Sequence, residues 1–339
     1  MKSNKWKFLL TGAATLTLLT ACTQASSQSA TKSNTAQTTA TSTSKNKTNN
    51  SNYFTDKDKD TSYDESKAST VKLSGSSASV SGDGVAVSGS TVTISKAGTY
   101  VISGESDGVQ IKVEAGDSDD VHIVLKGVTM TNTNAPISAT KAGHVYLTLA
   151  DGTTNTLSDS SSNNDEDADA VIFSKGDLTI NGSGTLNIDA KKNNGIKAND
   201  TLHITGGTYK ITAVGDAFNV NDELNITGTT MTIDADEDAA NANANQDEIF
   251  FTMNGGTLNV EVGQGDTDPI DSNGNITVTG GTIKLTGQSG FDFDGTATYT
   301  GGDIYINGEK QTEIVNSMPG GGGAPGGGGP QGGGPRGGH

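Results

Sequence analysis

The chain has 339 residues, 31% of them hydrophobic, and a formal net charge of −17 at pH 7. All 39 acidic residues lie between Asp56 and Glu313, together with 15 lysines and no arginine, so this segment carries a charge of −24. Such an acidic surface repels nucleic acid and anionic lipid headgroups, which excludes charge-driven binding to either. The single cysteine, Cys22, excludes an intramolecular disulfide and a thiolate metal site.

The N-terminus is typical of an exported bacterial lipoprotein. Residues 1–7 carry three lysines and no acid, and residues 8–20 are mostly apolar or small but too few for a stable membrane span. Cys22 follows in LTAC, which resembles a bacterial lipobox. We therefore predict a signal peptide over residues 1–21 and lipidation of Cys22. The protein is then expected on the extracellular face of the bacterial cell membrane, held there by its lipid anchor.

Two segments have compositions that do not support a folded core. Residues 22–69 begin as a stretch of Ser, Thr, Asn, Gln, Ala and Lys and end in DKDKDTSYDESK, and residues 318–339 are rich in Gly and Pro. Neither buries enough apolar surface to offset its chain entropy. We predict a disordered tether over 22–69, a disordered tail over 318–339, and a folded domain over 70–317.

The predicted domain contains strand phrases that recur every 21–27 residues. Each alternates apolar and polar residues on both sides of a glycine-containing bend, as in LTINGSGTLNI (178–188), LHITGGTYKI (202–211) and ITVTGGTIKL (276–285). Period-two alternation indicates half-buried strands, and glycine allows the bend. A repeat built only of strands favours a solenoid over the alternative, a β-sandwich. We predict an all-β fold, a parallel β-helix of about eight or nine coils.

Eight or nine residues before these phrases stands a polar residue, followed by a small residue and then, in most coils, a large apolar one. The polar residues are Asp169, Asn194, Asp216, Asp268 and Ser289, and Asp238 joins them if NANQ (243–246) is a four-residue insertion. We expect the small residue at a corner of the coil, the apolar residue inside, and the polar side chains stacked outside about 4.8 Å apart. Stacked carboxylates repel one another unless water or a cation neutralises them.

Two further segments, DEDAD (165–169) and DADED (234–238), read D-x-D-x-D, and GDTDPID (265–271) adds acids on the next coil. In an extended chain, alternate residues share a face, so these carboxylates would converge. Clustered oxygen ligands are what calcium prefers. We predict calcium as a cofactor, with its ligands among Asp165, Asp167, Asp169, Asp216, Asp234, Asp236, Asp238, Asp266, Asp268, Asp271 and Asp292. The alternative is a solvated acidic edge that keeps the protein soluble.

The next outward position along each coil is polar in most repeats. The residues there are Ile172, Lys197, Asn219, Asn241, Asp271 and Asp292. Uncharged amides and a lysine on an exposed face can hydrogen-bond to sugars, so we predict Lys197, Asn219 and Asn241 as carbohydrate-binding residues. The alternative for Lys197 is a surface lysine that relieves the repulsion between carboxylates.

Several phrases, in order, resemble the carbohydrate-binding domain family built on a pectate-lyase-like right-handed β-helix. They include GTYVISG (98–104), VHIVLKGVTMTN (121–132), VYLTLADGTTNTLSD (145–159) and NNGIKANDTLHITGGT (193–208). The resemblance covers about 90–317. It implies a right-handed parallel β-helix, an association with calcium, and binding of cellulose or acidic sugars such as polygalacturonate.

The composition bears on which of these functions to expect. Flat crystalline cellulose is usually gripped by an aromatic platform, but the single tryptophan, Trp6, lies in the predicted signal peptide, which favours an acidic glycan. A lyase on this fold needs a strong base beside the metal, and the only arginine is Arg336 in the tail. We predict a monomeric, non-catalytic binder of polysaccharide. The alternatives are a lyase or hydrolase with an unrecognised site, and a structural surface protein.

Overall fold

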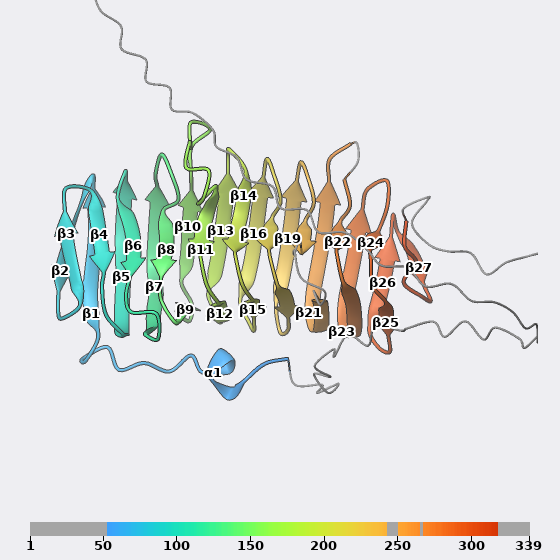
Figure 1. The fold of residues 1–339 in the computed structure, drawn as a ribbon, viewed down its shortest axis with the longest axis horizontal. Helices are drawn as coiled ribbons and strands as arrows, with labels where there is room; N and C mark the ends of the chain where they lie inside the picture. The colour runs from blue at the N-terminus through green and yellow to red at the C-terminus, as the bar shows by residue number, and fades with distance from the viewer. Residues whose placement is uncertain (1–52, 243–249, 265–266, 318–339) are drawn as a thin grey trace, which may run out of the picture. The chain divides into compact units, whose positions relative to one another are not determined.

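The computed structural model describes residues 53–242, 250–264 and 267–317. The chain divides into two units, Met1–Asn49 and Asn50–His339, and all described residues belong to the second. In that unit the chain winds into a parallel β-solenoid of about eight turns, which confirms the predicted fold (Figure 1). None of the helices in the described ranges has the length and apolar character needed to cross a membrane.

One side of the solenoid is a sheet of ten strands. Its members are β3 (Val85–Ser88), β4 (Thr91–Ile94), β6 (Gln110–Glu114), β8 (Ile137–Lys141), β11 (Ala170–Ser174), β14 (Asn194–Ala198), β17 (Phe218–Val220), β20 (Ala240–Ala242), β22 (Ile270–Ser272) and β24 (Phe291–Phe293). The strands from β4 to β24 are parallel and come from successive coils, while β3 is antiparallel to β4 at one end. We call this side the ten-stranded face.

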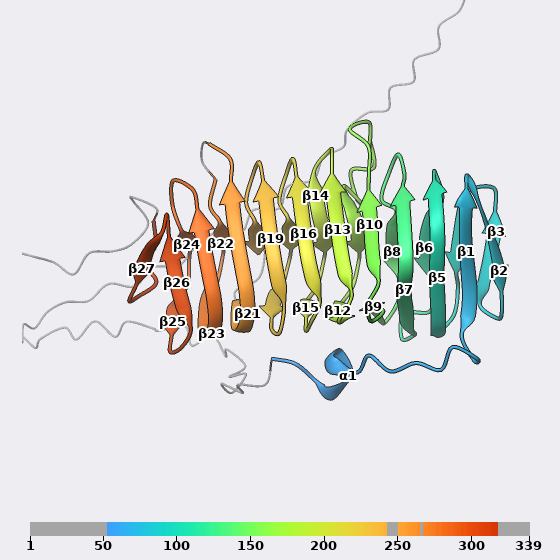
Figure 2. The ribbon, with the colours of Figure 1, turned by 180° about the vertical axis from the view of Figure 1, so that it is seen from behind.

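A second sheet of 17 strands folds around the other two sides. The strap face holds β9 (His144–Leu149), β12 (Leu178–Gly182), β15 (Leu202–Ile204), β18 (Glu223–Ile226) and β25 (Ala297–Tyr299). The groove face, in front in Figure 2, holds β10 (Thr154–Ser158), β13 (Thr185–Ala190), β16 (Thr208–Ala213), β19 (Thr230–Ala235) and β26 (Asp303–Ile306).

Four long strands bend around the corner and belong to both of these faces. They are β5 (Gly98–Asp107), β7 (Asp120–Thr131), β21 (Phe250–Val262) and β23 (Asn275–Thr286). β1 (Ser69–Gly75) pairs along β5 and, like it, extends over both faces. Antiparallel strands lie at the two ends: β1 pairs with β2 (Ser77–Ser81), β3 with β4, and β26 with β27 (Glu309–Gln311). Such pairing covers the terminal coils, whose open edges would otherwise invite another chain to add.

The core fills the inside of the coils with stacked apolar side chains. Residues in register on neighbouring coils form columns, and one column on the strap face runs through Val121, Val145, Leu178, Leu202, Leu224, Phe251 and Ile276. All of these side chains are buried. Because strand residues alternate between inside and outside, the polar residues between them face outward, as the period-two pattern predicts.

The glycines of the repeated phrases lie where the chain turns from the strap face to the groove face. Gly182 has φ +100°, a left-handed conformation that side chains other than glycine rarely adopt. A Cβ atom at Gly182 would also lie 2.2 Å from the carbonyl oxygen of Leu149 on the preceding coil. Glycine is therefore required there both by backbone conformation and by the spacing of coils.

Residues 53–68 precede β1 and run along the strap face, where they include α1 (Asp56–Lys59) (Figures 1 and 2). We call this segment the strap. Thr55 caps α1, since its hydroxyl accepts the Asp58 N–H at 3.2 Å and its own N–H donates to the Asp58 carboxylate at 2.7 Å. Phe54 is buried and packs edge-on against the ring of His203. The predicted tether, 22–69, includes this ordered strap.

Candidate functional site

A ladder of polar side chains follows the corner at which each coil enters the ten-stranded face. Oδ1 of Asn194 accepts the backbone N–H of Asp216 at 3.1 Å. One coil on, Oδ1 of Asp216 accepts the N–H of Asp238 at 3.2 Å, and Oδ1 of Asp238 in turn accepts the N–H of Asp268 at 2.7 Å. Ser289 ends the series by donating its hydroxyl to Asp268. These five residues, which we call the corner ladder, occupy equivalent positions on successive coils.

The first rung of the predicted alignment is displaced by one residue. Ala170, rather than Asp169, is the register partner of Asn194. Ile172 is accordingly paired with Ile196 and buried in the core, where outward exposure was expected. In this coil Ala170 occupies the position that Asn194 holds on the next coil, so Asp169 lies one residue before the ladder position.

The corner ladder is also bonded to the outward residues of the ten-stranded face. Nδ2 of Asn219 donates to Oδ2 of Asp216 at 2.7 Å, and Nδ2 of Asn241 donates to Oδ2 of Asp238 at 3.2 Å. The amide nitrogens of these two predicted carbohydrate-binding residues therefore already donate hydrogen bonds to the corner ladder.

The third predicted carbohydrate-binding residue, Lys197, also serves a carboxylate. Its Nζ donates to Oδ1 of Asp169 at 2.6 Å, while Nδ2 of Asn193 donates to the other oxygen, also at 2.6 Å. Both groups of this pair are more than two-thirds buried, since Lys197 is 18% and Asp169 25% exposed. The side chain of Lys197 is thus held in place by Asp169.

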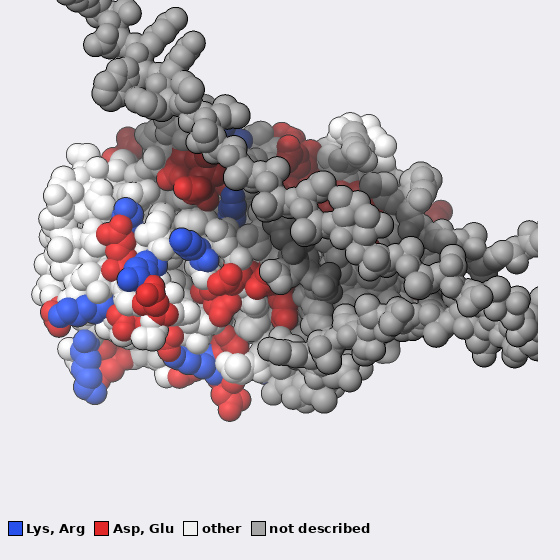
Figure 3. Space-filling view, viewed as in Figure 1, with Lys and Arg blue, Asp and Glu red and all other residues white. Residues whose placement is uncertain are grey.

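Negative charge accumulates in the lower-dielectric surroundings of the corner ladder. Burial, together with nearby carboxylates, raises the pKa of Asp216 to about 7 and that of Asp238 to about 6. Burial also raises the pKa of Asp271 to about 7, with Asp238 and Asp292 as the largest neighbouring charges. Figure 3 shows other acidic side chains gathered in patches with lysines between them. At the ladder, protons or a cation must supply the missing positive charge.

The two D-x-D-x-D segments do not run as extended strands. The chain bends at 166–168, where Oδ1 of Asp165 accepts the N–H groups of Asp167 at 3.2 Å and Ala168 at 3.1 Å. The extended geometry on which their convergence was predicted is therefore absent at 165–169, because a turn precedes β11.

The second segment is divided by a corner of the coil. Asp234 belongs to β19 on the groove face, Asp236 is exposed in the following turn, and only Asp238 enters the corner ladder. Asp268 and Asp271 join Asp238 from the next coil, and Asp292 follows one coil later. Asp266 lies outside the described residues.

The donor chemistry of the corner ladder fits a hard cation such as calcium, because its ligating atoms are all oxygens. Oδ1 of Asn241 is buried beside Asp238 and has no hydrogen-bond partner among the described residues. Within the same ranges, however, no group of three or more Asp, Glu, His or Cys side chains is arranged to hold a metal ion. A calcium ion would therefore have to draw carboxylates away from the backbone N–H groups they now accept.

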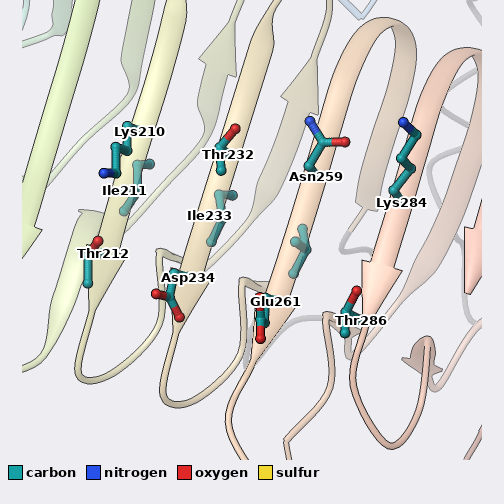
Figure 4. Close-up of a pocket in the computed structure, with 11 residues that line it drawn as sticks. Lys210, Ile211, Thr212, Thr232, Ile233, Asp234, Asn259, Glu261, Lys284 and Thr286 are labelled. Atoms are coloured by element: carbon teal, nitrogen blue, oxygen red, sulfur yellow. The ribbon is translucent and has the colours of Figure 1, made fainter. Parts of the chain in front are cut away.

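A shallow groove of about 430 Å³ crosses β16, β19, β21 and β23 on the groove face (Figure 4). Parallel pairing aligns its outward side chains in two rows. They are Lys210, Thr232, Asn259 and Lys284 in the first row, and Thr212, Asp234, Glu261 and Thr286 in the second. The alternate residues point into the core, so the floor of the groove is the backbone of the sheet.

The groove carries positive charge at its ends and negative charge along one side. Lys210 and Lys284 are three strand spacings apart, roughly 14 Å, and the hydroxyl of Thr232 and the amide of Asn259 lie between them. Such a row can bind an elongated ligand that carries hydroxyls and separated carboxylates.

Residues 88–317, which include the corner ladder and the groove, match the family model of the carbohydrate-binding domain-containing proteins. The chain belongs to this family. A carbohydrate-binding domain-containing protein of Acetivibrio thermocellus is 36% identical over 126 residues, which cover 35% of this chain and 44% of that relative. The match therefore spans less than half the length of the curated relative.

The carbohydrate-binding domain also resembles a solved structure described as a polysaccharide lyase-like protein from C. thermocellum, gadolinium derivative. The two are 28% identical, with a TM-score of 0.53 over 75% of this chain and 98% of that chain. The family match and the shared solenoid confirm the resemblance predicted from the sequence phrases.

Sequence reasoning singled out only Asp234 among the outward residues of the groove, and it did so as a metal ligand. Lys210 and Lys284 occupy outward positions in the repeated phrases, and those positions were interpreted only as the polar side of a strand. The available signal was that the same outward position of successive phrases holds Lys, Thr, Asn and Lys, which become neighbours once the coils are stacked.

Proposed function

We propose that this protein holds an acidic polysaccharide at the bacterial cell surface without cleaving it, with a lipid on Cys22 as its anchor and calcium as an aid to binding. Membership of the carbohydrate-binding domain family and the likeness to a polysaccharide lyase-like protein support a polysaccharide ligand. The lipid anchor follows from the LTAC sequence. Fractionating cells that carry a Cys22→Ala variant tests it, since retention of that variant in the membrane would contradict the anchor.

The observation that carries the proposal is the row of Lys210, Thr232, Asn259 and Lys284 in the groove (Figure 4). The strand spacing of about 4.8 Å is close to the length of one sugar residue in an extended glycan, so successive sugars meet successive strands. Two lysines at opposite ends suit two carboxylates on one chain, and a neutral glycan offers them nothing.

The best candidate for a catalytic base, Lys197, already has a carboxylate partner. Lys197 is ion-paired with Asp169 at 2.6 Å, so using it as a base would leave a largely buried carboxylate without its counter-ion. The second candidate function, a polysaccharide lyase, is favoured by the description of the structural neighbour.

The role of calcium is argued from the unbalanced charge of the corner ladder. Asp238, Asp268 and Asp271 lie on neighbouring coils, and a divalent cation would relieve their mutual repulsion in the folded state.

Substituting both groove lysines tests the proposed binding site. Lys210→Ala with Lys284→Ala is expected to weaken polygalacturonate binding about tenfold, because two exposed ion pairs of up to about 1 kcal/mol each are lost. Isothermal titration calorimetry measures this, with Lys72→Ala, an exposed lysine of β1 outside the groove, as the matched control. Equal affinity in all three proteins would place the ligand elsewhere.

The same samples decide between binding and cleavage. Absorbance of unsaturated products and new reducing ends are followed with polygalacturonate and calcium. Sustained formation of either product would replace the proposed function with the lyase or hydrolase alternative.

Calcium is expected to raise the melting temperature beyond the effect of sodium at equal ionic strength. A ligand that binds only the folded state adds about 2.7 kcal/mol at a hundred times its dissociation constant. Magnesium should add less, because it gives up its water reluctantly and demands octahedral geometry. Differential scanning calorimetry after chelation provides the reference.

Two double variants locate the ion. Asp268→Asn with Asp271→Asn should remove most of the calcium effect if the corner ladder binds it. Asp234→Asn with Asp236→Asn alters the exposed part of the D-x-D-x-D segment and should leave the effect in place. If calcium and sodium give the same melting curve for the unsubstituted protein, the ladder is only a solvated acidic edge.

A further inference from the structure

The contact between the strap and the solenoid is built around one buried carboxylate. Asp58 is 2% exposed, although it comes from a helix of only four residues. The hydroxyl of Thr179 donates to its Oδ1 at 2.7 Å, and Nδ1 of His203 lies 3.3 Å from its Oδ2. Burial acts to raise the pKa of Asp58, but the contacts with His203, Thr179 and Thr55 outweigh burial and hold that pKa well below its usual range.

The solenoid also binds the backbone oxygens of the strap. The hydroxyl of Thr205 donates to the carbonyl oxygen of Asp58 at 2.7 Å. Nδ2 of Asn181 donates to the carbonyl oxygens of Asp58 at 3.2 Å and Asp60 at 3.1 Å. The strap face thus presents hydrogen-bond donors to one carboxylate and to two neutral oxygens beside it. We call Thr179, Asn181, His203 and Thr205 the carboxylate seat.

The donors of the carboxylate seat are oriented by the solenoid, independently of the strap. The hydroxyl of Thr148 donates to Oδ1 of Asn181 at 2.6 Å, which turns the amide nitrogen of Asn181 outward. Nε2 of His144 lies 2.9 Å from the Thr179 hydroxyl, which donates its own proton to Asp58 and therefore accepts from His144. A site whose donors are already oriented loses little entropy when it binds a ligand.

The strap is an imperfect occupant of this face. Nδ1 of His203 is buried and, although 3.3 Å from Asp58, lacks hydrogen-bond geometry. Asn225 and Thr252 are in register with His203 on the two coils that follow, and both are fully buried. Oδ1 of Asn225 and Oγ1 of Thr252 have no hydrogen-bond partner among the described residues. Unpaired buried polar atoms are costly, so the position of His203 suits a ligand that meets its Nδ1, and Asn225 and Thr252 continue the polar row on the coils that follow.

Aromatic rings also lie beneath the strap. Tyr146 is stacked on His144 with ring centroids 4.1 Å apart, and Nζ of Lys57 from the strap lies over Tyr146. Phe54 of the strap covers the edge of His203. A cavity of about 220 Å³ lies between the strap and β5, β7 and β9. If the strap left, the rings of Tyr146 and His203 would be exposed beside the carboxylate seat, where the apolar faces of sugar rings could pack on them.

We propose that the carboxylate seat is a second glycan-binding site, for a uronate carboxylate, which the strap occupies in cis and which an acidic polysaccharide opens by displacing Asp58. The uronate carboxylate takes the place of the Asp58 carboxylate on Thr179 and His203. Neighbouring sugar oxygens take the places of the backbone carbonyls on Thr205 and Asn181. This site takes its class of ligand from the proposed function but uses none of the groove residues.

Emptying the seat in the full-length chain tests this proposal. Asp58→Ala is made in the Lys210→Ala, Lys284→Ala background, so that the groove contributes nothing to the result. Binding of oligogalacturonate is expected to strengthen at least tenfold over the same background with Asp58 intact, whereas a neutral galactose oligosaccharide should bind neither protein. Adding His203→Ala should abolish the gain. Asp64→Ala, which removes a strap carboxylate bonded only within the strap, should give none.

Acetate and oligogalacturonate distinguish a site for any small carboxylate from a site for a uronate. Acetate that raises the melting temperature of the Asp58→Ala protein as much as oligogalacturonate does would show a seat for any small carboxylate and would contradict a glycan site. A folded Asp58→Ala protein that binds oligogalacturonate no better than its parent would overturn the proposal.

A measurement on the intact strap decides the matter if Asp58→Ala does not fold. Lys57, Lys59 and Lys67 are tryptic sites within the strap. Oligogalacturonate is expected to accelerate cleavage there by a factor that rises with its concentration, while the neutral oligosaccharide has no effect. Unchanged cleavage at saturating oligogalacturonate would overturn the proposal, whatever the groove binds.

Discussion

Asp216→Asn is expected to stabilise the protein at pH 8 and to leave its stability almost unchanged at pH 4. Burial raises the pKa of Asp216 from 3.8 to about 7, so between these values the folded state binds a proton that the unfolded state does not. Stability contributed by this group is therefore greatest below pH 3.8 and is lost as the pH rises to 7. A shift of this size corresponds to about 2–4 kcal/mol, so the melting temperature should rise by roughly 5 °C or more at pH 8.

Asparagine suits this position, because Asn194 fills the equivalent rung one coil earlier with its Oδ1 on the N–H of Asp216. Chemical denaturation at pH 4, 6 and 8 in the presence of a chelator measures the effect. Asp236→Asn, in the exposed turn, is the matched control and should change stability by less than about 0.5 kcal/mol at every pH. A stability gain of the same size at all three values would show that ionisation of Asp216 is not its cause.

Gly182→Ala is expected to destabilise the fold by more than about 3 kcal/mol, the largest effect of any single substitution considered. The left-handed φ of +100° already disfavours a Cβ atom, and that atom would meet the Leu149 carbonyl oxygen at 2.2 Å. Relief requires the two coils to move apart, which would break their parallel hydrogen bonds and open the core between β9 and β12. Urea denaturation monitored by circular dichroism gives the change in free energy of unfolding.

Gly228→Ala separates the two causes. Gly228 also has a left-handed φ, +65°, but a Cβ atom there would lie 3.4 Å from the nearest atom, the Thr205 carbonyl oxygen. Only the conformational cost of about 1–2 kcal/mol should remain. Equal losses at the two positions would mean that the spacing between coils imposes no demand at Gly182.

The strands were predictable because each coil repeats the same local chemistry. Alternation of apolar and polar residues, with a glycine at the bend, determines which side chains face inward whatever the rest of the molecule does. The corner ladder was predictable for a related reason, since Asp216 and Asp268 stand at the same offset from their phrases and a four-residue insertion brings Asp238 onto the same edge. The first rung was missed because Asp169, Ala170 and Val171 match the polar, small, apolar pattern, although the structure puts Ala170 at the ladder position.

The chemistry of the candidate sites was less accessible to sequence reasoning. The D-x-D-x-D segments were expected to act as extended chain, but a turn at 166–168 and a corner after β19 interrupt them. The bonds of Asn219 and Asn241 to the corner ladder depend on side-chain rotamers, and the periodicity of a strand says nothing about these.

By itself, the sequence determined the coil, its inward and outward faces and its acidic corner, because these follow from residues close together in the chain. Only the tertiary structure decided that Lys210 and Lys284 share one groove, since the register between coils places them. The burial of Asp58 was likewise decided only by the tertiary structure. Its hydrogen-bond partners are distant in the sequence: Thr179 is 121 positions away and Thr205 is 147 positions away. A four-residue helix carries no local signal of the surface on which it docks.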